Sequence, residues 1–428
     1  MKQNHGVSRQ EIKGLYGFRA ILCLIVANYH IWQQSWLPQG FRIAGRWISY
    51  DYITRTGYMM VDGLILLSGF LLFLPHARVM TEGGKPPRAD HFYIKRLARI
   101  VPSYILAVLA ALLFIALPQQ LYLSPKVLWK DLISHLTFSQ TFFFQPYQAT
   151  HLNGVLWTVC IEVQLYLLFP VMAFCARKKP GLTLGTMAAL GWLYRAYVYF
   201  KIPDTAMYIN QMPAFLDVYA LGMLGALAYA TLDCWLKKAP DWKRWMAQLA
   251  ATALLIIGLI LISSVLGAQS KTASGDNWLA KLRLGQLYYR LPLAMGLMGC
   301  IMGLAFAPKA LQWVFGNKLM RFFADISFNF YIWHQILAVQ FAKHWFGIET
   351  LHNTPGLQKA FTLLCYAVAL VVATAMTYGV EKPAANKINQ WLKKRERKND
   401  YEGSETGNTE QTTDSLLLPA EGGGAGTD

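Results

Sequence analysis

Charged residues are scarce in this chain. They make up 15% of its 428 residues, against the roughly 25% usual for soluble globular domains, whereas hydrophobic residues make up 55%. Apolar runs of about 20 residues recur along the sequence, and this is the length that an α-helix needs to cross a bilayer. The shortage of charge therefore argues against a soluble fold and predicts an all-α integral membrane protein.

Cysteine is also sparse, and its spacing is uninformative. The six cysteines show no paired spacing of the kind that metal ligands have, and most lie within apolar runs, where a free cysteine behaves as a small hydrophobe. We therefore expect neither a disulfide framework nor a metal site. The first apolar run contains an arginine and lacks a small-residue cleavage site, so we expect no cleavable signal peptide.

Acidic residues are fewer than basic ones, at 23 Asp and Glu against 40 Lys and Arg, which gives a net charge of +17. Such an excess can indicate nucleic-acid binding. Here, however, most basic residues lie in short segments beside the apolar runs, where they set the orientation of membrane helices. We therefore predict membrane lipids, and no nucleic acid, as partners.

Ten apolar runs are predicted to span the membrane as a helical bundle. They lie near 14–34, 57–75, 100–118, 152–175, 182–200, 212–231, 247–267, 288–307, 326–345 and 360–380. With a cytoplasmic N-terminus, the segments inside carry 26 Lys and Arg and those outside carry 12, which agrees with the positive-inside rule. An even number of spans puts both termini on the same side, so we expect N- and C-termini to be cytoplasmic.

The domain organisation follows from these runs. Residues 1–385 are predicted to form one membrane-embedded domain. Residues 386–428 are predicted to form a cytoplasmic tail, first basic and then disordered and rich in Gly, Ser, Thr and acid. The expected location is the plasma (inner) membrane, with multiple passes.

A few ionisable residues interrupt the apolar runs. Each costs about 2.5–3.5 kcal/mol or more at the bilayer centre, so such residues usually face the bundle interior or a wet cavity. Within the runs these residues are Arg19, His30, Asp62, Glu162, Arg195, Asp217 and His334, with Arg96, Arg99 and Glu381 near the ends of runs.

Arg19 and His30 belong to the same run, eleven residues apart. In an ideal helix this spacing is about 20° past three full turns, so both residues share one face, about 16 Å apart along the axis. One interior cavity would then serve both. The alternative is an arginine that extends to the membrane surface and a histidine that bonds a neighbouring helix.

Glu162 and His334 are the other deep candidates. Glu162 is expected in the middle of the hydrocarbon core. Thr158 and Tyr166 lie four residues to either side of it on the same face, where they could bond its carboxylate. His334 is expected about 12 Å from the cytoplasmic end of its run, on the face that carries Ser327. A neutral buried glutamate and a histidine packed among aromatic rings are the structural alternatives.

Arg96 and Arg99 lie where a predicted cytoplasmic loop meets the third run, beside Lys95. Topology signalling or contact with lipid headgroups would explain them. They would also suit a phosphate clamp, because guanidinium groups bind phosphate in bidentate fashion. Cations at the cytoplasmic entrance and acid–base groups deeper inside fit a donor with a phosphorylated head and a long thin arm, the shape of a coenzyme A thioester.

Six short motifs give the chain a resemblance to a known family. It resembles the membrane-integral acyltransferase family 3, whose members O-acylate, and mostly O-acetylate, carbohydrates and some small molecules. The stretches that carry the resemblance are "LYGFRA" followed by His30, "LILLSGF" with Ser68, "KRLARIVP" with Arg96 and Arg99, "WTVCIEVQLYLLFP" with Glu162, "SFNFYIWH" with His334, and "EKP" from Glu381. They occur in the family's order from about residue 11 to 385.

The resemblance implies a function and roles for these residues. It implies transfer of an acyl group, most commonly acetyl, from a cytoplasmic acyl-coenzyme A to a hydroxyl of a carbohydrate or glycolipid. Acetyl-coenzyme A is then the donor, and no metal is needed. The implied catalytic residues are His30 and Glu162, the implied donor-binding residues are Arg19, Ser68, Arg96 and Arg99, and the implied acceptor path includes Asp62 and His334.

Two points stay open at the level of sequence. His30 would act either as a general base or as a transient acyl carrier, oriented by Glu162 or Asp62. A secondary transporter would also have buried charges in ten or more spans, although no repeated halves are seen here. Within the enzyme class, a lipid or a small molecule is the alternative acceptor.

Overall fold

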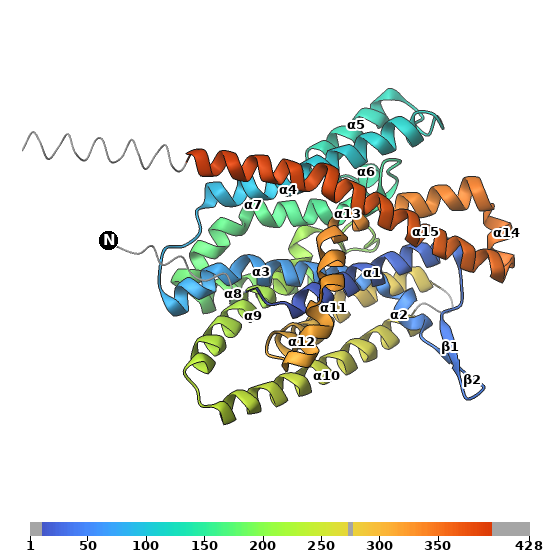
Figure 1. Ribbon diagram of the computed structural model, residues 1–428. Helices are drawn as coiled ribbons and strands as arrows, with labels where there is room; N and C mark the ends of the chain where they lie inside the picture. The colour runs from blue at the N-terminus through green and yellow to red at the C-terminus, as the bar shows by residue number, and fades with distance from the viewer. Residues whose placement is uncertain (1–10, 273–276, 396–428) are drawn as a thin grey trace, which may run out of the picture.

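The computed structural model describes residues 11–272 and 277–395, and helices dominate this part of the chain (Figure 1). The long α-helices are α1 Gly14–Ser35, α3 Val61–Glu82, α4 Ala89–Ala111, α7 Trp157–Lys178, α8 Pro180–Lys201, α9 Leu216–Lys237, α10 Asp241–Thr272, α11 Trp278–Ala305, α13 Lys318–Phe341 and α15 Pro355–Met376. The shorter α-helices are α2 Asp51–Arg55, α5 Pro125–Leu136, α6 Phe144–Gln148, α12 Lys309–Gly316 and α14 Ile348–Asn353. One antiparallel hairpin, β1 Gly40–Ile43 and β2 Arg46–Ser49, pairs Phe41 with Ile48.

Each of the ten predicted runs coincides with a helix. Eight helical stretches are long and apolar enough to cross a membrane, which confirms the prediction of an all-α membrane protein. The helices α8 and α13 have similar lengths but do not reach that apolar composition. The number of crossings and the cytoplasmic placement of the termini therefore stay predictions.

Apolar side chains cover the outside of the bundle as well as its core. Helix α10 shows this most clearly, because Ile256, Ile257, Leu259 and Ile260 are all more than half exposed. A surface of this kind is stable in hydrocarbon and unfavourable in water. The chain is therefore a multi-pass membrane-integral protein.

Glycines allow neighbouring helices to approach closely. A Cβ atom on Gly69 of α3 would lie 2.6 Å from the carbonyl oxygen of Tyr219 on α9, and one on Gly258 of α10 would lie 2.6 Å from that of Gly296 on α11. Small residues at helix contacts are typical of membrane bundles, where close backbone packing replaces the hydrophobic effect. The contact at Gly69 fixes α3 beside α9 at the level of Ser68.

Three helices end in π-helical turns, η2 Leu112–Ala116 after α4, η6 Ala342–Phe346 after α13 and η7 Thr377–Glu381 after α15. The chain stays helical beyond η7 as far as Arg395. The predicted tail is thus helical over its first residues, and its remainder, 396–428, lies outside the described residues.

The two ends of the bundle differ. The connection from α3 to α4 lies at the same end as both ends of the described chain, and the β1–β2 hairpin and α14 lie at the other end (Figure 1). This arrangement agrees with termini on one side. It also places the basic segment 76–99 at the end where the described chain begins and ends.

Candidate functional site

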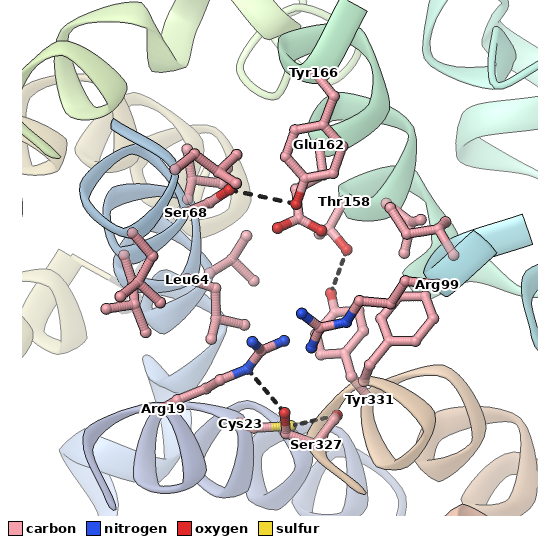
Figure 2. Close-up of a pocket in the computed structure, with 18 of the residues that line it drawn as sticks. Arg19, Cys23, Leu64, Ser68, Arg99, Thr158, Glu162, Tyr166, Ser327 and Tyr331 are labelled. Atoms are coloured by element: carbon pink, nitrogen blue, oxygen red, sulfur yellow. Dashed lines mark hydrogen bonds between the residues drawn. The ribbon is translucent and has the colours of Figure 1, made fainter. Parts of the chain in front are cut away.

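A cavity of about 170 Å³ lies among α1, α3, α4, α7 and α13 (Figure 2). We call it the arginine cavity, because Arg19, Arg96 and Arg99 line it together with Glu162. Its other polar lining residues are Cys23, Ser68, Thr158, Tyr166, Ser327 and Tyr331. Residues from five of the six motifs therefore meet in one place, although they are up to about 300 positions apart in the chain.

Arg19 extends from α1 toward α13. Its Nε donates a hydrogen bond to Ser327 Oγ at 2.9 Å, and Ser327 Oγ in turn donates to the carbonyl oxygen of Ala324. The sequence placed Ser327 on the face of His334, whereas the structure pairs it with Arg19. This contact fixes one nitrogen of the guanidinium group and leaves the other two directed toward the cavity (Figure 2).

Arg96 and Arg99 both come from α4 but have different partners. Arg99 Nε lies 3.5 Å from Glu381 Oε1, at the end of the π-helical turn η7, and Asn329 Nδ2 donates to the other oxygen of Glu381 at 2.8 Å. Arg96 has no carboxylate partner among the described residues, and its Nε is buried without a hydrogen bond. Its guanidinium carbon lies 5.8 Å from the ring centroids of Phe92 and of Tyr166.

The arginine cavity therefore carries more positive than negative charge. Figure 2 shows Arg19 and Arg99 pointing toward each other. Within the described chain, Glu162 forms no ion pair with any of the three arginines at 4.0 Å or less, so Glu381 is the only carboxylate this close to them. The three arginines are partly buried, and guanidinium groups withdrawn from water without enough anions are costly unless a ligand supplies the negative charge. The geometry is suited to an anionic group.

The polar residues of α7 face the same cavity. Thr158 Oγ1 is hydrogen-bonded to the Tyr331 hydroxyl at 2.8 Å, and Ser68 Oγ donates to the Tyr166 hydroxyl at 3.4 Å. Thr158 thus bonds Tyr331 and not Glu162, the partner considered from the sequence. These bonds tie α7 to α13 and to α3 around the carboxylate of Glu162 (Figure 2).

A second cavity, of about 210 Å³, contains His30, and we call it the histidine cavity. Its remaining lining residues are Tyr29, Tyr58, Met59, Val61, Asp62, Trp157, Asn210, Gln286, Arg290 and Tyr331. Val61 and Tyr331 also line the arginine cavity. The sequence predicted one cavity for Arg19 and His30, and the structure places them in two adjacent ones.

Both polar contacts of the His30 ring in the described part of the chain are made by Nδ1. Gln33 Oε1 lies 3.0 Å and Gln335 Nε2 lies 3.1 Å from that nitrogen. The expected orienting carboxylates, Glu162 and Asp62, do not take this position. Nε2 is left without a protein partner among the described residues, so it is open to a substrate, and it can accept a proton when Nδ1 carries the ring hydrogen.

His334 packs beside His30, with ring centroids 5.3 Å apart. It is fully buried, its Nδ1 lies 3.1 Å from the carbonyl oxygen of Phe330, and its Nε2 has no hydrogen-bond partner in the described residues. Because a carbonyl oxygen can only accept, Nδ1 carries the hydrogen and Nε2 presents a lone pair.

Asp62 forms a buried ion pair with Arg290 of α11, at 3.2 Å between Oδ2 and Nε. Arg290 also donates to the carbonyl oxygen of Ile209 and to Asn210 Oδ1, and its guanidinium carbon lies 4.0 Å from the ring centroid of Phe215. Arg290 was not among the candidates named from the sequence, although it falls just inside the predicted run 288–307. Helix α11 begins at Trp278 and so puts Arg290 well inside the bundle.

The other two charged residues predicted within spans, Arg195 and Asp217, form a buried bidentate ion pair between α8 and α9. Arg195 also donates to the carbonyl oxygen of Ala214. Mutual neutralisation is sufficient to explain both residues, and neither lines the two cavities described above.

A third cavity, of about 400 Å³, lies between the end of α3 and the start of α4. We call it the basic vestibule, because its lining includes Arg78, Lys85, Arg88, His91, Lys95 and Arg96. It shares Leu71, Leu72 and Arg96 with the arginine cavity. The vestibule, the arginine cavity and the histidine cavity therefore form a series that begins at the end of the bundle where the termini lie.

Comparison with known proteins gives a consistent family. The family model described as an acyltransferase domain matches residues 12–378, which confirms the resemblance seen in the sequence. Peptidoglycan O-acetyltransferase OatA of Listeria monocytogenes is 23% identical over 396 residues, covering 87% of this chain and 55% of that protein. Nodulation protein 10 of Rhizobium leguminosarum is 26% identical over 219 residues, covering 46% of this chain and 55% of that protein. The chain thus spans about half the length of these curated relatives, and no solved structure matches it.

Proposed function

We propose, from the premise that the chain belongs to the acyltransferase-domain family, that it transfers an acyl group from acyl-coenzyme A to a hydroxyl group at the membrane. The donor is acetyl-coenzyme A, delivered from the cytoplasm, and the acceptor is a carbohydrate or glycolipid. The membrane is the plasma membrane. Peptidoglycan O-acetylation in the OatA relative supports both the acetyl group and the class of acceptor.

The observation that carries this proposal is the arrangement of charge along the three cavities. The basic vestibule suits the phosphates of coenzyme A, because arginine and lysine side chains bind phosphate oxygens strongly. Arg19, Arg96 and Arg99 continue the positive region inward, and Ser68 adds a hydroxyl beside it. A long thin thioester arm would then extend toward His30.

The chemistry centres on the free Nε2 of His30. A hydroxyl is a weak nucleophile at neutral pH, and an imidazole can accept its proton as the oxygen attacks the thioester carbonyl. The carbon–sulfur bond then breaks, and the leaving thiolate takes the proton from the imidazolium. In the alternative route, Nε2 itself attacks the thioester carbonyl, the carbon–sulfur bond breaks and the thiolate leaves. The hydroxyl then attacks the acyl-imidazole, the carbon–nitrogen bond breaks, and the hydroxyl proton passes to the thiolate.

The remaining residues have supporting roles in this proposal. Glu162 acts in catalysis as the carboxylate of the arginine cavity, balancing part of its positive charge when no donor is bound. Asp62, paired with Arg290, and His334, packed on His30, belong to the path of the acceptor.

The test uses purified protein in vesicles with radiolabelled acetyl-coenzyme A, and membranes of the expressing cells as the source of acceptors. His30→Ala should abolish label transfer while the protein inserts and purifies normally. His344→Ala is the matched control, since His344 lies on η6, outside the three cavities, and it should leave transfer intact. An undiminished rate in His30→Ala would remove His30 from the chemistry.

The acceptor is tested separately. Mass analysis of surface glycans from cells with and without the gene should show acetyl groups that depend on it. If lipids or small molecules, and not glycans, carry the acetyl groups that depend on the gene, the acceptor belongs to those classes. Uptake of a solute into the same vesicles, without any acetyl transfer, would show that the protein is a transporter and not an enzyme.

A further inference from the structure

Two amide side chains meet the His30 ring at the same nitrogen atom. Gln33 Oε1 lies 3.0 Å from Nδ1 and Gln335 Nε2 lies 3.1 Å from it. Gln33 belongs to α1, three residues beyond His30, whereas Gln335 belongs to α13 and is 305 residues away. One contact to Nδ1 therefore comes from the helix of His30 itself and the other from a helix distant in sequence.

The two amides favour opposite states of that atom. An amide oxygen only accepts, so Gln33 bonds Nδ1 when Nδ1 carries a hydrogen. An amide nitrogen only donates, so Gln335 bonds Nδ1 when Nδ1 presents a lone pair. A neutral imidazole has one hydrogen, so the first state leaves Nε2 free to accept a proton and the second places the hydrogen on Nε2.

The Gln33 amide has a second contact besides the imidazole. Gln33 Nε2 donates to the Tyr29 hydroxyl at 2.8 Å, while its oxygen faces Nδ1. The other ionisable residues that line the histidine cavity or contact the ring are Tyr29, Tyr58, Asp62, Arg290, Tyr331 and His334. Asp62 and Arg290 neutralise each other, so in the described chain the amides are the hydrogen-bonding partners of the ring.

We infer that Gln33 and Gln335 are positioning residues that divide His30 between its two neutral tautomers. Gln33 holds the tautomer whose Nε2 can remove the proton of a hydroxyl, and Gln335 holds the tautomer whose Nε2 cannot. The balance between them sets the fraction of molecules able to start the reaction. This inference rests on the proposed function, in which His30 accepts that proton.

Substitution by leucine, which is similar in size, removes each amide in turn. Two similar bonds hold about half of the molecules in each form, and one net hydrogen bond of about 1 kcal/mol changes the ratio of the forms about fivefold. Gln33→Leu should therefore lower kcat about threefold, and Gln335→Leu should raise it by somewhat less than about twofold. The apparent KM for acetyl-coenzyme A should stay unchanged in both variants.

The pH profile gives a readout that a packing role would not move. Gln33→Glu puts a carboxylate beside Nδ1, which stabilises the imidazolium relative to the neutral ring that accepts the proton. The acidic limb of kcat/KM should then move to higher pH by about one unit. Gln33→Glu is almost the same shape as the native side chain, so it tests the inference even where a leucine variant folds poorly.

The experiment measures coenzyme A release from acetyl-coenzyme A by the full chain in vesicles, with membranes of the expressing cells as acceptor source. Equal losses of kcat in both leucine variants, or an unmoved acidic limb in Gln33→Glu, would overturn the inference while the proposed function stands. Full activity in His30→Ala would overturn both. Opposite effects of the two leucine substitutions would establish it.

Discussion

At the scale of single residues, the three arginines of the arginine cavity differ in which protein partners would be left unpaired if the arginine were replaced. Arg99 has Glu381 at 3.5 Å, and Arg19 has Ser327. Arg96 has aromatic rings around it and no carboxylate among the described residues. Arg96 is therefore the position where loss of a donor contact can be separated from loss of an internal ion pair.

Arg96→Gln is predicted to raise the apparent KM for acetyl-coenzyme A about tenfold or more, because a hydrogen bond to a charged group contributes about 1.5–3 kcal/mol. Thermal stability should change little, since no acid loses its partner. The measurement is the initial rate against donor concentration. Arg55→Gln is the control, because Arg55 forms an exposed pair with Asp51 away from the three cavities. An unaltered KM in Arg96→Gln would assign Arg96 to membrane topology.

Charged residues of the candidate site could be predicted from the sequence, and neutral ones could not. Arg19, Arg96, Arg99 and Glu162 attract notice because a charge in an apolar run is costly. Gln33 and Gln335 carry no charge, and nothing in a single sequence says that two distant amides meet one imidazole. That meeting depends on how α1 packs against α13, which is a property of the tertiary structure.

At the scale of elements, the presence of each helix could be predicted from its apolar run, whereas the local geometry of the helices could not. All ten predicted runs are helical, but their π-helical turns were not foreseen, because one extra residue in a turn hardly changes an apolar run. The turn η7 matters most, since it ends at Glu381 beside Arg99. Close helix packing at Gly69 is likewise visible only once α9 is known to lie against α3.

Gly69→Ala is predicted to lower the stability of the protein by about 1–3 kcal/mol, because the added methyl group meets the backbone of α9 and must push the two helices apart. Thermal unfolding in detergent measures the effect. Gly185→Ala on α8 is the matched control, since a Cβ there meets nothing within 4 Å, and alanine favours a helix over glycine by up to about 1 kcal/mol. Equal stability of the two variants would contradict close packing of α3 on α9.

At the scale of the whole molecule, the two ends of the bundle should face opposite sides of the membrane. The basic vestibule lies at the end where the termini lie, and the β1–β2 hairpin lies at the other end (Figure 1). Positive charge retains a segment in the cytoplasm, so the vestibule end should be cytoplasmic.

Cysteine labelling tests this orientation. In a variant without native cysteines, Lys85→Cys in the α3–α4 connection should react with an impermeant maleimide only in inside-out vesicles. Arg42→Cys in the hairpin should react only in right-side-out vesicles. Both native side chains are exposed, so access is not limiting. Labelling of both positions from one side would show that the predicted topology is wrong.

The wall between the arginine cavity and the histidine cavity has a consequence for which donors can react. Val61 and Tyr331 line both spaces, so whatever travels from one to the other must pass these two side chains. In the proposed function the acyl group passes this constriction on its way to His30, and each added methylene would need more room beside a valine and a tyrosine held in a tightly packed interior. Chain-length selectivity would then depend on this constriction and not on the arginines proposed to bind coenzyme A.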